Sequence, residues 1–223
     1  MEYIATKELE QDKDYFGFKL RTRKDSTDLR VIDEVLANNF YQVPSKLKTV
    51  IDIGAHIGTF SLKAARAGAR VYAFEPEGFN YKTLVHNVEI NGYEDRITCL
   101  KLGVGKKGKN KLYVHPYKTG GSSMYVRLIR GLEREKYQTV DFISIKDVFE
   151  FYNIRRCDLL KMDCEGSEED IFEDIDDYVK RIDQISAELH SGRIRDKVIN
   201  KMSKWYDIEC TNRKKRVWVF NKK

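Results

Sequence analysis

An acid-bearing segment of this 223-residue chain combines a carboxylate with glycines in a pattern suited to binding a ligand. It runs from Val50 to Thr59 (VIDIGAHIGT), where an apolar strand containing Asp52 leads into a glycine turn and then a helix. Glycine lets a backbone approach a ligand closely, and the helix N-terminus offers free N–H donors. The spacing is G-x-x-x-G, unlike dinucleotide-binding G-x-G-x-x-G or a P-loop, and Asp52 would repel phosphate. A ligand carrying an ammonium or hydroxyl group is therefore favoured over a pyrophosphate.

A second acid, Glu75, ends the next apolar segment and is followed by Pro76. In an open α/β sheet, ligands bind beyond the carboxyl ends of the strands, and an acid there can bond both hydroxyls of a ribose. A nucleoside that carries a cation in place of a pyrophosphate satisfies both segments. S-adenosylmethionine is such a nucleoside.

Two further carboxylates, Asp163 and Glu165, follow the apolar run Asp158–Met162. Alternation along a strand predicts that both side chains lie on one side of the chain, beside the same crevice. A carboxylate there could orient a substrate hydroxyl and accept its proton. The pair could instead hold a hard cation such as Mg²⁺, but no metal ligand is assigned because only oxygen atoms of unknown number are available. The structural alternative is that both acids only favour the start of the helix predicted from Ser167.

A histidine, His190, closes the run Glu188-Leu189-His190 at the end of another predicted strand. Histidine ordinarily titrates near neutrality, so His190 is a candidate acid/base or substrate contact. A core or surface histidine is the alternative interpretation.

These residues are positioned by an alternation of strands and helices, which predicts an α/β fold with a mostly parallel sheet and helices on both faces. The last two predicted strands are joined by only a short connection, so they must pair antiparallel. The predicted strands are Lys48–Ile53, Arg70–Phe74, Arg96–Leu102, Asp158–Met162, Gln184–Leu189, Asp207–Thr211 and Val217–Phe220. The predicted helices are Leu29–Phe40, Phe60–Ala67, Phe79–Ile90, Ser167–Val179 and Ile194–Trp205.

The length is sufficient for one α/β domain. Residues 1–45 are expected to form an N-terminal helical and extended segment packing on the core, and residues 46–223 the main domain. A β insertion is expected near 104–146, with strands at Lys111–His115 and Thr139–Ile143.

The composition indicates a folded protein but does not identify its binding partner. A content of 41% hydrophobic residues excludes a disordered chain, and 41 Lys and Arg against 35 Asp and Glu leave a net charge of +6. This surplus keeps nucleic acid open as a partner, although acids are interleaved with the bases. Four scattered cysteines indicate reduced thiols. No apolar run is long enough to cross a bilayer and no signal peptide is evident, so a soluble, cytoplasmic protein without a membrane span is expected.

Three motifs resemble class I S-adenosylmethionine-dependent methyltransferases of the FkbM family. They are Ile51–Thr59, Phe74-Glu75-Pro76 and Leu160–Glu168 (LKMDCEGSE), within a resemblance that covers about Asp25 to His190. The third motif is the one most specific to the family. The resemblance implies a Rossmann-like, seven-stranded sheet with an antiparallel C-terminal hairpin, and methyl transfer most often to a hydroxyl of a sugar or secondary metabolite.

The resemblance also implies site residues by their positions in these motifs. Asp52, Gly54 and Gly58 would line the amino-acid and sulfonium part of the cofactor, and Glu75 the ribose. At position 56 the family more often has Asn than the His56 found here. The expected cofactor-binding residues are Asp28, Asp52, Gly54, Ala55, His56, Gly58, Glu75, Pro76, Leu102, Gly103 and Asp163, and the expected catalytic residues are Asp163, Glu165 and His190.

The leading hypothesis for function is therefore an S-adenosylmethionine-dependent O-methyltransferase acting on a carbohydrate or other small hydroxylated molecule. A methyltransferase acting on RNA or another nucleic acid is the alternative that the positive charge motivates. Against it, the segment Asp163–Gly166 lacks the Asp/Asn-Pro-Pro-Tyr/Phe run typical of enzymes that methylate base amines. A non-catalytic S-adenosylmethionine-binding module is a third hypothesis. The oligomeric state does not follow from the sequence.

Overall fold

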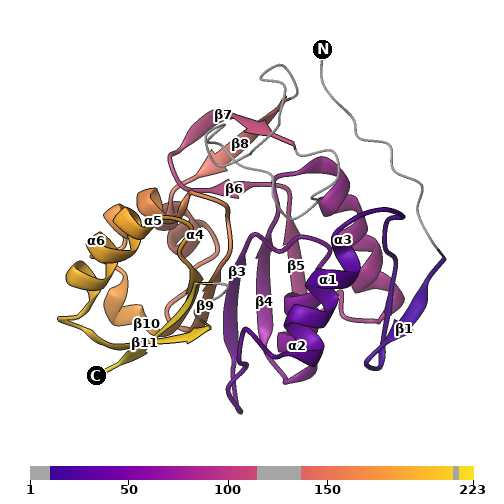
Figure 1. Cartoon of the computed structure of the whole chain (residues 1–223), viewed down its shortest axis with the longest axis horizontal. Coiled ribbons are helices and arrows are strands. Elements are labelled where there is room, and N and C mark those ends of the chain that lie inside the picture. The colour runs from indigo at the N-terminus through magenta and orange to yellow at the C-terminus, as the bar shows by residue number, and fades with distance from the viewer. Residues whose placement is uncertain (1–10, 115–136, 213–215) are drawn as a thin grey trace.

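The computed structural model describes residues 11–114, 137–212 and 216–223, and its centre is a seven-stranded sheet (Figure 1). Its spatial order is β11-β12-β10-β9-β3-β4-β5. The strands from β5 to β10 run parallel, whereas β12 is antiparallel to both β10 and β11. The bounds are β3 Thr49–Ile53, β4 Arg70–Phe74, β5 Ile97–Leu100, β9 Cys157–Met162, β10 Ile182–Glu188, β11 Tyr206–Asn212 and β12 Val217–Lys222. The predicted fold class, with its antiparallel C-terminal hairpin, is confirmed.

The order of the strands fixes where a ligand can bind. The chain proceeds from β3 outward through β4 to β5, and then returns to the other side of β3 for β9 and β10. The order therefore reverses between β3 and β9, and their carboxyl ends diverge there. In open α/β sheets this switch point is where a crevice forms.

Helices cover both faces of the sheet (Figure 1). Strand residues alternate between two cores: Val50 packs with the helices preceding β5, whereas Ile51 and Ile53 pack with those following β8. Strands buried on both faces explain the nearly continuous apolar runs in the sequence. The first group comprises α1 Asp28–Ile32, its continuation as a π-helix Asp33–Ala37, α2 Thr59–Arg66 and α3 Gly78–Ile90, and the second comprises α4 Ile145–Phe151, α5 Glu168–Asp174 and α6 Gly192–Met202.

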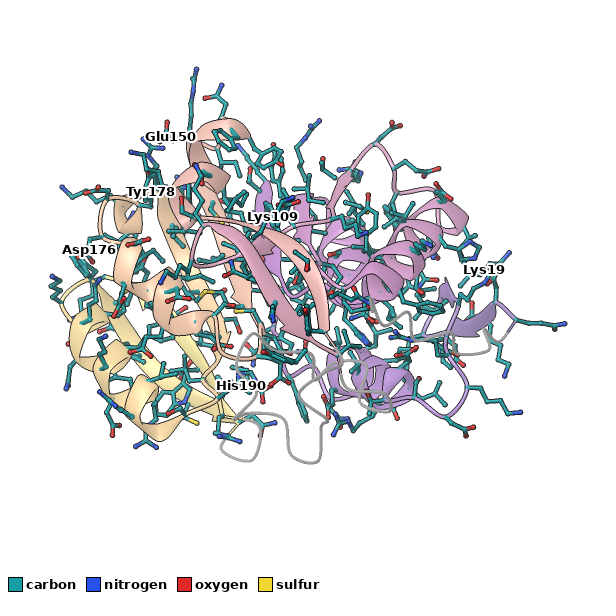
Figure 2. All side chains as sticks on the ribbon, turned by 90° about the horizontal axis from the view of Figure 1, so that it is seen from above. Lys19, Lys109, Glu150, Asp176, Tyr178 and His190 are labelled. Carbon is teal, nitrogen blue, oxygen red and sulfur yellow. The ribbon has the colours of Figure 1, made fainter. Side chains whose placement is uncertain are left out.

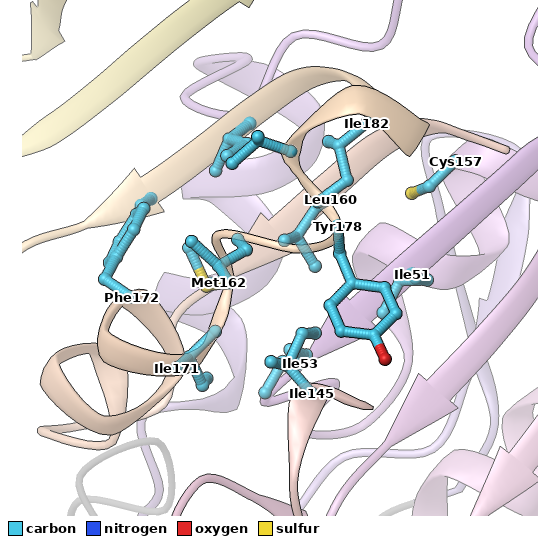
Figure 3. Packing of buried hydrophobic residues seen from close by; sticks show 14 of the residues in the cluster. Ile51, Ile53, Ile145, Cys157, Leu160, Met162, Ile171, Phe172, Tyr178 and Ile182 are labelled. Carbon is cyan, nitrogen blue, oxygen red and sulfur yellow. The ribbon is translucent and has the colours of Figure 1, made fainter. Parts of the chain in front are cut away.

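The second core holds the strand ends that carry the site (Figure 3). Leu160 and Met162 of β9 are fully buried beside Ile53 of β3 and Phe172 of α5. Deleting such a side chain typically costs about 2–5 kcal/mol of stability. The ends of β3 and β9 are therefore held rigidly next to each other.

Two small sheets flank the main one. β1 Lys13–Tyr15 and β2 Phe18–Leu20 form a hairpin that the sequence reading did not predict. Its turn has positive φ at Phe16 (56°) and Gly17 (78°), as a two-residue hairpin turn requires. Phe18 and Leu20 join the core on the α1–α3 side.

The second small sheet belongs to the expected insertion. β8 Tyr137–Ile143 lies between β6 Gly103–Val104 and β7 Gly108–Tyr113. The predicted pair of extra strands is therefore present, with β7 starting earlier than Lys111. The middle of the insertion, 115–136, and residues 213–215 of the connection between β11 and β12 lie outside the described residues.

One predicted helix ends earlier than expected, and one helix was not predicted. The helix predicted over Ser167–Val179 ends at Asp174, because acids at 174, 176 and 177 oppose the negative end of the helix dipole. Helix α4 was missed, although Ser144 and Asp147 form a capping box that marks its start. Among the described helices, none is long and apolar enough to cross a membrane.

Candidate active site

A cavity opens beyond the carboxyl ends of β3, β4 and β9, at the switch point of the sheet. Its wall is made by residues directly after these strands, by the start of the insertion, and by the α1 region. Among the expected site residues, the wall includes Gly54, Ala55, His56, Glu75, Pro76, Leu102, Gly103, Asp163 and Glu165.

The glycine turn after β3 packs directly against the backbone that follows β9, as well as lining the cavity. Gly54 has φ of +78°, and a Cβ there would overlap the carbonyl oxygen of Asp163. The Asp163 N–H donates to the Ile53 carbonyl at 3.1 Å. The close approach that requires glycine is thus between the ends of β3 and β9. Gly58 lies outside the cavity wall and faces Leu84 instead.

Asp52 meets an ammonium group, but one from the protein itself. The fully buried Asp52 lies 3.1 Å from Nζ of Lys161 and accepts a 2.6 Å hydrogen bond from Ser61. Burial opposes the charge on Lys161, but the carboxylates of Asp52 and Asp163 raise its pKa above the usual value. Asp52 is not part of the cavity wall, whereas Lys161 is. A buried ion pair therefore supports the floor of the cavity.

Glu75 is a buried acid that follows β4 and lines one end of the cavity. Its carboxylate accepts hydrogen bonds from the backbone N–H groups of His56 (2.8 Å) and Glu77 (2.9 Å), and from the Asn80 amide (3.2 Å). Burial raises the pKa of Glu75 to about 7, and these donors partly oppose the rise. A carboxylate has about four lone-pair positions, so Glu75 retains acceptor capacity toward the cavity.

His56 is held as a neutral imidazole. Arg23 Nη2 lies 3.0 Å from its Nε2, and a guanidinium can only donate, so Nε2 is the acceptor. Burial lowers the pKa of His56 to about 4. Asp28, 3.4 Å from the same nitrogen, therefore pairs with Arg23, which it contacts at 2.7 Å. Asp28 is fully buried behind the cavity wall. His56 and Glu75, with Asn80, Arg23 and Asp28 around them, are called the Glu75 end below.

An apolar wall lies between the strand ends and the insertion. Phe74, Leu102, Val104 and Phe142 contribute to it. A Cβ at Gly103 would overlap the Phe142 ring, so β8 packs directly on the chain after β5. The insertion therefore helps to close the cavity over this wall.

The opposite end of the cavity is crowded with acids. Asp163 follows β9 and Glu188 ends β10, and the Tyr41 hydroxyl donates to both, at 3.0 and 3.3 Å. Burial, with these two carboxylates, raises the pKa of Tyr41 well above its usual value, so the phenol stays protonated. Asp163, Glu165, Glu188, His190 and Tyr41 are called the Asp163 end.

Glu165 reaches this end by an unusual backbone conformation. β9 stops at Met162, so strand alternation does not position Asp163 and Glu165. Instead, Glu165 has φ of 51° and Gly166 has φ of 115°, a left-handed turn that brings its carboxylate within 4.8 Å of Asp163. Such conformations cost about 1–3 kcal/mol in a non-glycine residue and cluster at functional sites. Burial raises the pKa of Glu165 to about 7.

His190, labelled in Figure 2, is not part of the cavity wall but lies 3.4 Å from Glu165, which is. Its Nδ1 donates to Glu168 at 2.9 Å, and Glu165 Oε2 lies 3.4 Å from its Nε2. Burial opposes protonation, but Glu168, Glu165 and Asp163 raise the pKa of His190 to about 10. The near-neutral titration that suggested an acid/base role does not apply to this environment.

Several residues of the site were not predicted from the sequence. Tyr41 and Arg23 are single examples of common residue types in a region without a motif. Lys161 and Glu188 had a signal, since Lys161 lies two residues before Asp163 and Glu188 two residues before His190, both within quoted motifs. Asn80 had none beyond its place in the first turn of the helix after Glu75.

The sheet order, the switch-point cavity and the buried acid after the second parallel strand of the core define a class I, Rossmann-like methyltransferase. A profile of the methyltransferase FkbM domain matches residues 52–209, more than half of the chain. The chain therefore belongs to the FkbM methyltransferase family, whose members use S-adenosylmethionine.

Two curated relatives are fungal methyltransferases. Methyltransferase 1 of Beauveria bassiana (strain ARSEF 2860) is 28% identical over 159 residues, covering 63% of this chain and 64% of that protein. Methyltransferase sdnD of Sordaria araneosa is 24% identical over 180 residues, covering 66% and 68%. The match thus spans less than two thirds of the first relative.

Solved structures share the fold. A Clostridium thermocellum protein described as an rRNA methylase superposes with a TM-score of 0.51 at 11% identity, covering 90% of this chain and 97% of that one. At this identity the likeness concerns the fold alone.

Proposed function

We propose that this methyltransferase transfers a methyl group from S-adenosylmethionine to a hydroxyl oxygen of a sugar or another small hydroxylated molecule. The observation that carries the proposal is the Asp163 carboxylate in the cavity wall, which accepts a 3.0 Å hydrogen bond from the Tyr41 hydroxyl. A carboxylate in this position suits a neutral O–H donor.

The residues of the Glu75 end fit the cofactor. Glu75 keeps acceptor capacity for ribose hydroxyls, and the apolar wall around Leu102, Gly103 and Phe142 suits an adenine ring. Bound there, S-adenosylmethionine supplies a methyl group activated by a sulfonium. His56 and Asn80 hold Glu75 from the other side, so its carboxylate is oriented before the cofactor arrives.

The residues of the Asp163 end would orient the acceptor. Asp163 accepts the hydrogen bond of the acceptor hydroxyl and takes its proton, while Tyr41 restrains the carboxylate by donating to Oδ2. Glu165 adds a second acceptor oxygen. Lys161, anchored on Asp52 and the Gly54 carbonyl, supplies a nearby positive charge.

A nucleic-acid acceptor is the second candidate, supported by the net charge of +6 and by the description of the Clostridium relative in fold. The described wall disfavours it, because Asp163, Glu165 and Glu188 gather at the end that would receive the acceptor. Phosphates are repelled by such a cluster.

Tritiated methyl transfer into fractionated extract of the source cells tests the proposal. Label in carbohydrate or small molecules, lost in Asp163→Asn and kept in the exposed control Asp207→Asn, is the expected result. Salt-sensitive label in RNA, label in protein, or cofactor binding without transfer would overturn it.

A further inference from the structure

The imidazole of His190 has two different environments at its two nitrogens. Nδ1 donates to Glu168, which is completely buried. Nε2 faces three carboxylates, with Glu165 Oε2 at 3.4 Å, Glu188 Oε1 at 3.6 Å and Asp163 Oδ1 at 3.8 Å. The His190 side chain itself is only 10% exposed. A buried nitrogen is thus aimed into a group of converging oxygens.

These distances are too long for hydrogen bonds and suit ligands around an ion. An N–H···O bond places its heavy atoms about 2.7–3.2 Å apart, so none of the three oxygens is within ordinary reach of Nε2. Ligands about 2.1 Å from a shared metal lie roughly 3.0–3.5 Å from one another. One ligand atom each from Asp163, Glu165 and His190 falls within 4.8 Å of the others. If these ligand atoms moved slightly closer together, their separations would match those around a shared metal ion.

Glu168 supplies an independent indication. A metal-binding histidine commonly donates its second N–H to a carboxylate, which fixes the tautomer and directs the free nitrogen at the ion. Glu168 makes this contact from the first turn of α5, through the same oxygen that accepts from the Cys164 N–H at 3.3 Å. A fully buried carboxylate in contact with one imidazole is the usual support of a metal ligand.

The balance of charge points the same way. Four carboxylates, those of Asp163, Glu165, Glu168 and Glu188, surround His190 within 4 Å. Lys161 is engaged by Asp52 and the Gly54 carbonyl. Arg216, whose guanidinium donates to the His190 carbonyl oxygen at 2.6 Å, also acts on Glu165 through its charge. A divalent ion would add two positive charges among these carboxylate oxygens.

We propose that Asp163, Glu165 and His190 form a binding site for a divalent transition-metal ion, with Glu188 beside it and Glu168 as the residue that positions His190. The imidazole nitrogen shifts the preference from Mg²⁺, which favours oxygen alone, toward ions such as Mn²⁺, Fe²⁺ or Zn²⁺. The site adjoins the cavity wall through Asp163 and Glu165. If the proposed function holds, the ion polarises the acceptor hydroxyl and eases loss of its proton.

Binding of Mn²⁺ to the full chain, measured by electron paramagnetic resonance without cofactor or acceptor, tests the site. One tight equivalent is expected in the wild type. His190→Gln and Asp163→Asn should each weaken binding at least tenfold, and Glu168→Gln by roughly 10–100-fold. The exposed control Glu209→Gln should bind as the wild type does. Calorimetry with Zn²⁺ gives a second measurement of the same variants.

The proposal is overturned if the wild type binds no Mn²⁺ or Zn²⁺ at millimolar concentration, or if binding survives in the double variant Asp163→Asn/His190→Gln. Circular dichroism of each variant verifies that loss of binding is not loss of fold. Because the measurement needs no methyl transfer, metal binding without hydroxyl methylation would leave this site standing while rejecting the proposed function, and the reverse result would do the opposite.

Discussion

The two ends of the cavity differ in how their charged side chains are paired. At the Glu75 end, each charged side chain already has a partner inside the protein: Arg23 pairs with Asp28, and Glu75 accepts three N–H donors. At the Asp163 end, the carboxylates of Asp163, Glu165 and Glu188 lie within 4 Å of one imidazole, which Glu168 contacts from its other nitrogen. The Tyr41 hydroxyl lies within hydrogen-bond distance of two of them. The first end is complete before a ligand arrives, whereas the second gains most from an added cation or hydroxyl donor.

The difference teaches how one cavity can separate binding from chemistry. A preformed network binds with little reorganisation, which suits a cofactor common to a whole family. A cluster of carboxylates with excess negative charge attracts a proton or a cation strongly, which suits the proton-accepting step. Substitutions at the two ends should therefore affect different measured constants.

The largest effect is expected at the Asp163 end. Asp163→Asn removes the proposed proton acceptor while keeping its shape, so methyl transfer should fall by roughly 10²–10⁴-fold. Affinity for S-adenosylmethionine should change by less than about threefold, because the amide keeps the shape of Asp163 and the hydrogen bonds to Glu75 stay in place. Single-turnover transfer and calorimetry measure the two quantities. Equal losses in both would erase the distinction between the ends.

A smaller effect of the opposite kind is expected from Glu75→Gln. The amide keeps one oxygen acceptor but loses the charge, so cofactor affinity should fall by about 10–100-fold, as for a charge-assisted hydrogen bond. Transfer at saturating cofactor should stay near that of the wild type. The exposed Glu94→Gln is the matched control. Unchanged affinity in Glu75→Gln would remove this residue from the cofactor site.

The preformed character of the Glu75 end should be visible in the dependence of stability on pH. The folded pKa of His56 is lowered to about 4, below its unfolded value near 6.5. The unfolded chain therefore binds the extra proton between these values, and stability falls as pH falls through that window. At pH 5 this amounts to about 2 kcal/mol, and above pH 7 it vanishes.

His56→Asn removes the contribution of His56 to the pH dependence of stability. Comparing this variant with the wild type separates that contribution from those of the other titrating groups nearby. The free energy of unfolding of the variant should fall less than that of the wild type between pH 7.5 and pH 5. Urea denaturation at the two pH values measures the difference. Parallel declines in the two proteins would show that His56 is protonated in the fold. The surrounding charged groups are Arg23, Asp28, Glu75, Lys161 and Asp163.

The smallest expected effect concerns the restraint on Asp163. Tyr41→Phe removes one hydroxyl that donates to Asp163 and Glu188, and should reduce transfer by roughly 5–10-fold. Cofactor affinity should not change. Tyr93→Phe, outside the cavity wall, is the control. Full activity in Tyr41→Phe would mean that the carboxylates hold their positions without it.

Much of the fold was predictable because its signals are local and repeated. Apolar runs such as 158–162 and the glycine turn at 54–58 specify strands and their exits directly. Hairpin β1–β2 was missed because its strands have three residues each, too few for a period to show. The end of α5 was missed because acids beyond Asp174 act through the dipole rather than through the apolar pattern.

Only those residues of the site that lie in a sequence motif could be predicted. Glu75, Asp163 and Glu165 follow strands whose carboxyl ends must meet, so their proximity follows from the fold class. The partners that set their chemistry do not: Tyr41 is separated from Asp163 by 122 residues and comes from a segment without a signature. The state of His190 likewise depends on Glu168, a contact across 22 residues between the first turn of α5 and the chain after β10.

The most direct test of the central claim is calorimetry of S-adenosylmethionine with the wild type and with Asp163→Asn/His190→Gln. The account predicts one-to-one binding in both, with affinities equal within about threefold, and no binding of NAD to either. Failure of the wild type to bind S-adenosylmethionine, or binding of NAD in its place, would contradict it.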